Sequence, residues 1–132
     1  MFRKRHGVTH PDLALAFAVD NLANSQTDTA LAALLTSTKF VFPFGGWIVG
    51  LGVNLSAAIV SGVLSYDVVI GSTQQAIDTV QDVAATYHNW IAPKEYYRFN
   101  AGDKLGVSYT SGTLGVATVD ATALLLVVLD MR

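Results

Sequence analysis

The amino-acid sequence predicts a mainly β protein, an antiparallel β-sandwich, and three observations carry that prediction. First, the 27 consecutive residues Phe40–Tyr66 include no charged side chain. Second, large side chains occupy alternate positions of 47–55, which is the period of a strand with one buried face. Third, the alternation returns at 64–70 after a turn-forming stretch. The large residues are Trp47, Val49, Leu51, Val53 and Leu55, then Leu64, Tyr66, Val68 and Ile70. We expect the first four to be core residues.

The uncharged run is long enough to suggest a membrane span, because roughly 20 apolar helical residues cross a bilayer. Its composition argues against a helix. Pro43 and the pair Gly45–Gly46 would break a helix near its start, and Gly50, Gly52 and Gly62 would weaken it further. We therefore expect paired strands here and no membrane partner.

The first 24 residues are predicted to form an N-terminal basic and apolar arm, ahead of a β-sandwich domain of residues 25–132. Arg3, Lys4 and Arg5 lie in a stretch without acids, whereas the rest of the chain holds five of the eight basic residues against ten acidic ones. Leu13, Leu15, Phe17 and Val19 alternate with alanines, and Thr9, Pro11 and Asp12 suggest a helix start, so the segment is either a short helix or extended. Pro11 and Asp12 interrupt any signal-peptide pattern, and we do not expect secretion.

Further strands are expected along the domain. Ala30–Thr36 is a candidate first core strand, and Lys39–Phe44 is a candidate edge strand because it contains a proline. After the two alternating strands, a helical excursion is predicted near Ser72–Tyr87. Ser72 and Gln75 have the spacing of a capping box, and Ile77, Val80, Ala84 and Tyr87 follow at helical spacing.

The last strands are expected at Tyr96–Phe99, at Leu105–Tyr109 and at Ala121–Leu129. The final segment is apolar on both faces: Leu124, Leu126 and Val128 share one face, and Ala123, Leu125, Val127 and Leu129 share the other. Such a strand lies centrally, with its second face covered by another layer or subunit. With 52% hydrophobic and 14% charged residues, the chain is expected to bury apolar surface against a copy of itself as a homotrimer. The alternative cover is the 13–22 segment folding back over the sheet.

The sequence offers little for catalysis, and we expect no enzyme and no cofactor. His88 is the one histidine outside the arm, and a hydrogen-bonding role suits its neighbours Tyr87 and Asn89. Asp78 and Asp82 are four residues apart and are interpreted as a solvated acidic face, not a metal site. The chain has no cysteine, no phosphate-binding loop and no calcium loop. Three basic residues are too few for tight nucleic-acid binding, so no nucleic-acid partner is expected.

Three motifs occur in order. Phe42-Pro-Phe-Gly-Gly-Trp-Ile-Val49 leads into the alternating strand, Phe99-Asn-Ala-Gly-Asp-Lys-Leu-Gly-Val107 contains a turn, and Val119-Asp120-Ala121-Thr122-Ala123 opens the last strand. In the second motif, Gly102 permits positive φ and Asp103 can accept hydrogen bonds from turn amides, so both are predicted to be structural turn residues.

Over residues 24–130, this pattern resembles the small jelly-roll decoration (cement) proteins of tailed-bacteriophage capsids. The resemblance implies a jelly-roll sandwich and a trimer on the outer surface of an icosahedral capsid, where it glues neighbouring major capsid protein subunits in the virion. The arm residues Arg3, Lys4, Arg5, Leu13, Leu15, Phe17 and Val19 would then bind the lattice.

Two other classes remain open at this point. A tail-fibre or head-fibre receptor-binding module would present loop aromatics to a host glycan, with Tyr87, Trp90, Tyr96 and Tyr97 as candidates. A shell-forming viral jelly roll would build the lattice itself, although 132 residues is small for that task.

Overall fold

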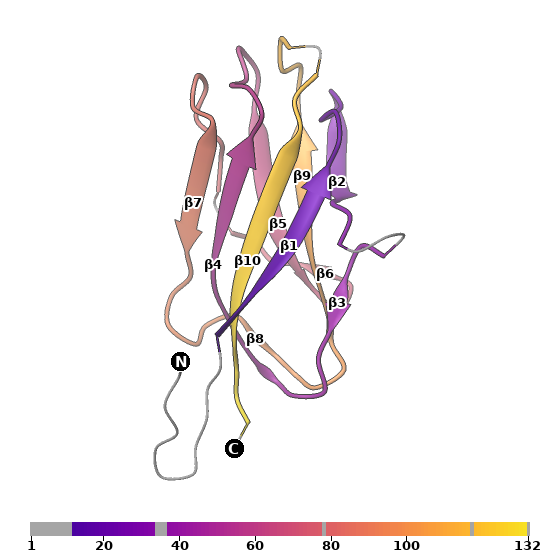
Figure 1. Ribbon diagram of the computed structural model, residues 1–132, viewed down its shortest axis with the longest axis vertical. Helices are drawn as coiled ribbons and strands as arrows, with labels where there is room; N and C mark the ends of the chain where they lie inside the picture. Colours follow the sequence, from indigo (N-terminus) through magenta and orange to yellow (C-terminus); the bar gives the residue numbers. More distant parts are fainter. Residues whose placement is uncertain (1–11, 34–36, 78, 117, 132) are drawn as a thin grey trace.

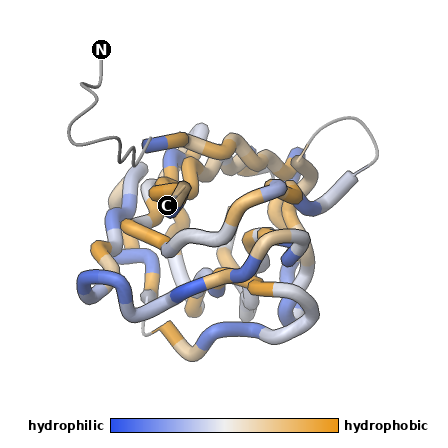
Figure 2. The backbone as a smooth tube through the Cα atoms, turned by 90° about the horizontal axis from the view of Figure 1, so that it is seen from below, coloured by the Kyte–Doolittle hydropathy of each residue, from blue (hydrophilic) through white to orange (hydrophobic). Residues whose placement is uncertain are grey.

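The computed structural model describes residues 12–33, 37–77, 79–116 and 118–131. The chain forms two five-stranded sheets, and all of their strand pairs are antiparallel. Figure 1 shows the two layers with their strands running along the long axis, and Figure 2 shows them end-on, with hydrophobic positions in both. The described residues contain no helix long and apolar enough to cross a membrane. The prediction of a mainly β, antiparallel fold is confirmed.

The first sheet has the order β1-β10-β4-β7. The short strand β8 pairs with the start of β4, whereas β7 pairs with its later residues. The second sheet has the order β2-β9-β5-β6, and β3 also pairs with β9. The strands are β1 (Asp12–Val19), β2 (Gln26–Ala30), β3 (Phe40–Val41), β4 (Gly46–Leu55), β5 (Leu64–Ile70), β6 (Thr73–Gln74), β7 (Tyr87–Ile91), β8 (Arg98–Phe99), β9 (Lys104–Ser111) and β10 (Ala121–Leu129).

The core lies between the sheets, which is the arrangement of a β-sandwich. Ile48, Leu125 and Val127 from the first sheet meet Leu64, Leu105 and Val107 from the second, and each of these side chains has no exposed surface. Burying one such aliphatic side chain contributes about 1.5–3 kcal/mol. The packing of these alternating residues therefore holds the layers together.

A β-bulge in β4 changes which residues of the predicted core strand face inward. On β10, Leu126 lies opposite Gly50 and Val127 opposite Ile48, so Val49 has no partner there. An extra residue shifts the alternation by one position. Leu51 and Val53 are buried as predicted, but the prediction for Trp47 and Val49 is wrong, because both remain partly exposed while Ile48 points into the core.

The helix predicted at Ser72–Tyr87 is also wrong, because the described residues there form β6, an irregular edge and the start of β7. Backbone hydrogen bonds from Gln75 N to Val68 O, from Tyr66 N to Thr79 O and from Gln81 N to Leu64 O tie this edge to β5. Its buried residues Ile77, Thr79 and Gln81 follow a period of two. Pairing with the free edge of β5 outweighs the local capping signal, as tertiary contacts often do.

The N-terminal segment is part of the sandwich from residue 12 onward, so the predicted arm of residues 1–24 is not a separate unit there. β1 pairs with β10 along its whole length, from Asp12 opposite Val128 to Val19 opposite Ala121. Its alternation turns Leu15 and Phe17 inward, whereas the alanines face outward. Hydrogen bonding to β10 explains why the extended alternative prevails over a helix. The segment lies beside β10, not over it as alternative cover.

Several predicted strands are displaced or shortened. The first core strand expected at Ala30–Thr36 is replaced by β2, which ends at Ala30, followed by the buried Leu31. Residues 34–36 lie outside the described residues. The edge strand expected at Lys39–Phe44 is reduced to β3, and that expected at Tyr96–Phe99 to β8.

Candidate interaction surface

Three rows of outward positions on the first sheet carry no charged side chain, and we call them the uncharged face; the adjoining row holds the charged Asp12 and Arg98. The three rows run through β1, β10, β4 and β7. The rows are Ala14, Leu126, Gly50 and Ile91, then Ala16, Leu124, Gly52 and Asn89, then Ala18, Thr122, Asn54 and Tyr87. Because neighbouring strands lie side by side (Figure 1), these residues make one continuous patch.

The relief of the uncharged face alternates between low and high strips. β1 contributes a low strip of alanines, and β10 a ridge on which Leu124 and Leu126 are 44% and 41% exposed. β4 contributes a trough because two of the three residues that it adds to the rows are glycines. β7 contributes a second ridge with Ile91 82% exposed.

The trough contains two hollows of about 270 and 340 Å³. One is bordered by polar side chains, including Asn54, Asn89 and Thr122, and the other is mostly apolar, with Leu126 and Ile91 at its sides. Gly52 lies in both, so the hollows are parts of one groove along β4.

The two glycines of the trough differ in whether the surrounding chain leaves room for a side chain. A Cβ on Gly50 would lie 2.7 Å from the carbonyl oxygen of Trp90, so no other residue fits there. A Cβ on Gly52 would meet its nearest atom, Asn89 Oδ1, at 3.4 Å, which is ordinary contact. Glycine inside a strand weakens it and often marks the close approach of another molecule. The fold alone therefore does not account for Gly52.

The predicted site residues are separated by the structure. Leu15 and Phe17 are core residues, Leu13 and Val19 are partly buried, and Arg3, Lys4 and Arg5 lie outside the described residues. Leu15 and Phe17 are therefore unavailable to a capsid, which corrects their assignment to a binding arm. On β10, Leu124 and Leu126 are exposed, whereas Val128 is partly buried.

The Gly102–Asp103 turn has the local geometry of a structural turn. Gly102 has a φ of +85°. The Asn100 amide donates to Asp103 Oδ2 at 2.9 Å, and the Asp103 amide donates to Asn100 O at 3.0 Å. Both hydrogen bonds close the loop between β8 and β9, so Asp103 is engaged within the turn.

The remaining polar candidates, His88 and Asp82, lie in different surroundings. The His88 ring faces the core, with Nε2 3.3 Å from Thr79 Oγ1 and the ring 5.9 Å from that of Tyr66. Asp82 is exposed and Asp78 lies outside the described residues. No group of three histidines or acids among the described residues could hold a metal ion.

Aromatic side chains gather near the end of β7. Trp90 and Tyr97 pack edge to face with ring centroids 5.4 Å apart, and Tyr96 packs on Tyr97 at 4.8 Å. Tyr96 is 70% exposed, whereas its two neighbours pack against the core. Tyr87 is exposed at the opposite end of β7. The four aromatics therefore do not form one site.

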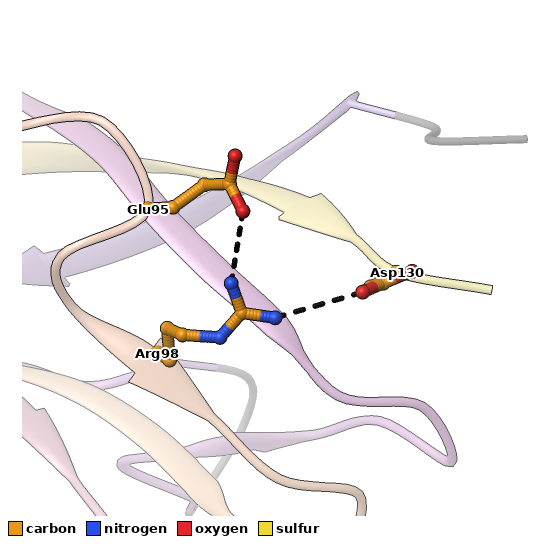
Figure 3. A network of polar contacts seen from close by, with 3 residues as sticks. All are labelled: Glu95, Arg98 and Asp130. Carbon is orange, nitrogen blue, oxygen red and sulfur yellow. Dashed lines mark hydrogen bonds and ion pairs between the residues drawn. The ribbon is translucent and has the colours of Figure 1, made fainter. Parts of the chain in front are cut away.

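Arg98 forms a polar cluster with Glu95 and Asp130 (Figure 3). Its guanidinium lies 2.9 Å from Glu95 Oε1, 3.6 Å from Asp130 Oδ2 and 5.4 Å from the centroid of the Trp47 ring. Partly exposed ion pairs contribute about 0–1 kcal/mol each. The cluster fastens the chain after β10 to β8 and to the start of β4.

The second sheet carries a pair of carboxyl groups that the sequence did not reveal. Burial, together with the hydrogen bond and charge of Asp28, raises the pKa of Asp67 to about 6. Thr110 Oγ1 donates to Asp28 Oδ1 at 3.3 Å. These residues come from β5, β2 and β9, so only the sheet brings them together.

We predict that Asp67 makes the protein less stable as the pH rises from about 4 to about 6. Its folded pKa of about 6 exceeds the ordinary value of 3.8, so the folded state keeps a proton that the unfolded state has lost in this window. Asp67→Asn should therefore gain stability over the wild type as the pH rises through this window, measured by urea denaturation across it. The exposed Asp82→Asn is the control. Parallel pH profiles for Asp67→Asn and the wild type would contradict the prediction.

Comparison with known proteins adds no relative, because no protein-family model matches the chain and no curated protein matches its sequence. The resemblance to capsid decoration proteins therefore rests on the three sequence motifs.

Proposed function

We propose that this chain is a structural virion protein that decorates and stabilises an icosahedral phage head, bound as a homotrimer to the outside of the major capsid lattice. The observation that carries the proposal is where the three resembling motifs lie. The first leads into β4, the second contains the turn between β8 and β9, and the third opens β10. Each motif therefore lies at a structural junction, where a shared fold would need it.

The fold that we propose within this function is a jelly roll. Its support is the strand order, β1-β10-β4-β7 in one sheet and β2-β9-β5-β6 in the other. Among these eight strands, the chain changes sheet at every connection except that from β5 to β6. An eight-stranded double sheet with such crossing connections is the pattern of two Greek keys.

The body acts as a passive module, not an enzyme, and the first residues contribute attachment by charge. Arg3, Lys4 and Arg5 precede a body in which acids outnumber bases, and opposite charges speed and orient binding to an acidic capsid surface. Leu15 and Phe17 stabilise the sandwich and do not enter the lattice contact. The affinity must then come from these charges together with exposed surface of the body.

Neutralising Arg3, Lys4 and Arg5 together to alanine should lower the association constant for stripped capsids by roughly tenfold, because exposed charge pairs contribute about 0.2–1 kcal/mol each. Binding of the wild type should weaken with salt, and the triple variant should lose most of that dependence. Occupancy on purified capsids at several salt concentrations measures both effects.

The exposed body residue Lys94→Ala is the matched control and should bind as the wild type does. A truncation that removes residues 1–22 is unsuitable, because it would remove β1. Undiminished binding by the triple alanine variant would assign the contact to the body, and a wild-type chain that does not bind capsids at all would overturn the proposed function.

A receptor-binding module of a tail fibre or head fibre is the second candidate. The exposed Tyr96, held on Tyr97 beside Trp90, favours it, because sugars stack on exposed aromatic rings. Binding of the wild type to host glycans, with loss of binding in Tyr96→Ala, would support this function over capsid decoration.

A further inference from the structure

We propose that the uncharged face is the surface on which copies of this chain meet, with the β10 ridge of one copy occupying the β4 trough of another. The inference takes from the proposed function that copies of this chain associate, and it names a contact that pairs two of them. Leu124 and Leu126 form the ridge, and Gly50 and Gly52 form the floor of the trough.

The high and low strips of the uncharged face on one copy fit the low and high strips of the same face on a second copy. Its strips alternate low, high, low and high through β1, β10, β4 and β7. When two copies face each other about an axis parallel to the strands, β10 lies over β4 of the other copy and β1 lies over β7. Leu124 then faces Gly52, because the two residues share a row. Each high strip meets a low one, which is the requirement for close packing between sheets.

The chemistry of the face selects a copy of the same chain as its occupant. Its twelve residues include no charged side chain, and the nearest charges on this side of the sheet, Asp12 and Arg98, lie in the adjoining row at one end. Attraction between charges therefore contributes little within the face itself. The exposed leucines and Ile91 gain free energy by leaving water. A second identical face supplies both the apolar surface and the matching relief.

The size of the face sets the expected strength of the contact. Four strands about 4.8 Å apart and three rows about 6.7 Å apart give a flat footprint of roughly 400 Å². Two copies thus bury at least about 800 Å², below the roughly 1,200–2,000 Å² of standard interfaces. We therefore expect association in the micromolar range, strengthened where a capsid holds the copies side by side.

Two single variants test the ridge and the trough separately. Leu124→Ser removes an exposed ridge side chain, and Gly52→Leu fills the trough at a position where the chain itself tolerates a Cβ. In sedimentation equilibrium from about 1 to about 100 µM, each variant should lower the association constant by about tenfold or more. Val60→Ser, which alters an exposed apolar residue away from the face, should associate as the wild type does.

Mixing the two variants makes the test specific, because the filled trough of a Gly52→Leu copy would then face the shortened ridge of a Leu124→Ser copy. Restored association in the mixture supports ridge-in-trough contact, and its absence overturns it. Circular dichroism checks that both variants fold. Leu124→Ser replaces an exposed side chain with a smaller one, so this variant keeps the test valid if Gly52→Leu does not fold.

The mass of the wild-type complex then separates this inference from the trimer. Two copies with dissociated variants support the surface and reject the trimer. Three copies overturn this pairing, because a contact that two copies make reciprocally about one axis closes with two. Variants that associate like the wild type, or a wild type that stays monomeric throughout, overturn the inference. Capsid occupancy tests decoration independently of these results.

Discussion

Phe17→Ala should lower the free energy of unfolding by about 3–5 kcal/mol, the usual cost of removing a buried aromatic side chain. Phe17 is 1% exposed and packs edge to face on Phe40 with ring centroids 5.3 Å apart. This contact joins β1 of the first sheet to β3 of the second. Urea denaturation of the purified protein measures the loss.

The matched control is Phe44→Ala. Phe44 is 41% exposed, so its replacement should lower the free energy of unfolding by about 1 kcal/mol or less. The comparison tests whether the N-terminal segment belongs to the sandwich or binds elsewhere. If Phe17→Ala lowers the free energy of unfolding as little as Phe44→Ala does, then β1 is not packed in the sandwich and can act as a separate arm.

Leu51→Ala should cost about 2–5 kcal/mol, because it leaves a cavity between the two sheets. Leu51 is 2% exposed and pairs with Leu125 on β10, which is fully buried. Leu51 follows the bulge at Val49. The extra residue allows both Ile48 and Leu51 to face inward although they are three positions apart. Equilibrium unfolding in urea measures the change.

Val49→Ala provides the control for the bulge. Simple alternation makes Val49 and Leu51 equivalent, whereas the bulge leaves Val49 partly exposed on the outer side. We expect Val49→Ala to cost less than about 1 kcal/mol. Equal losses at the two positions would mean that the strand alternates without a bulge.

The place of β1 in the sheet changes how attachment to a partner is understood. An arm anchored by Leu15 and Phe17 would have to withdraw these side chains from the core and lose their burial. Three of the exposed large hydrophobic side chains, Leu124, Leu126 and Ile91, lie together on the uncharged face. These residues alternate with core residues and lie on the opposite side of the same strands.

The β class and the central place of the last strand could be predicted from the residues alone. Alternation at 64–70 follows directly from the two-residue period of a strand, and all of its predicted large residues point toward the core or its margin. The apolar character of both faces of β10 correctly indicated a strand flanked on both sides, by β1 and β4. It also placed Leu124 and Leu126 on the opposite face from the buried Leu125 and Val127.

Contacts between distant strands determine which residues of β4 face inward, the extended conformation of the described residues within 72–87, and which residues share each surface. A bulge depends on the register with β10, and the edge at Gln75–Gln81 depends on the free hydrogen-bonding groups of β5. Asp28 and Asp67 become neighbours only because β9 lies between their strands. Local patterns report which side chains prefer burial, whereas these features depend on which distant strand supplies the partner, and that choice belongs to the whole fold.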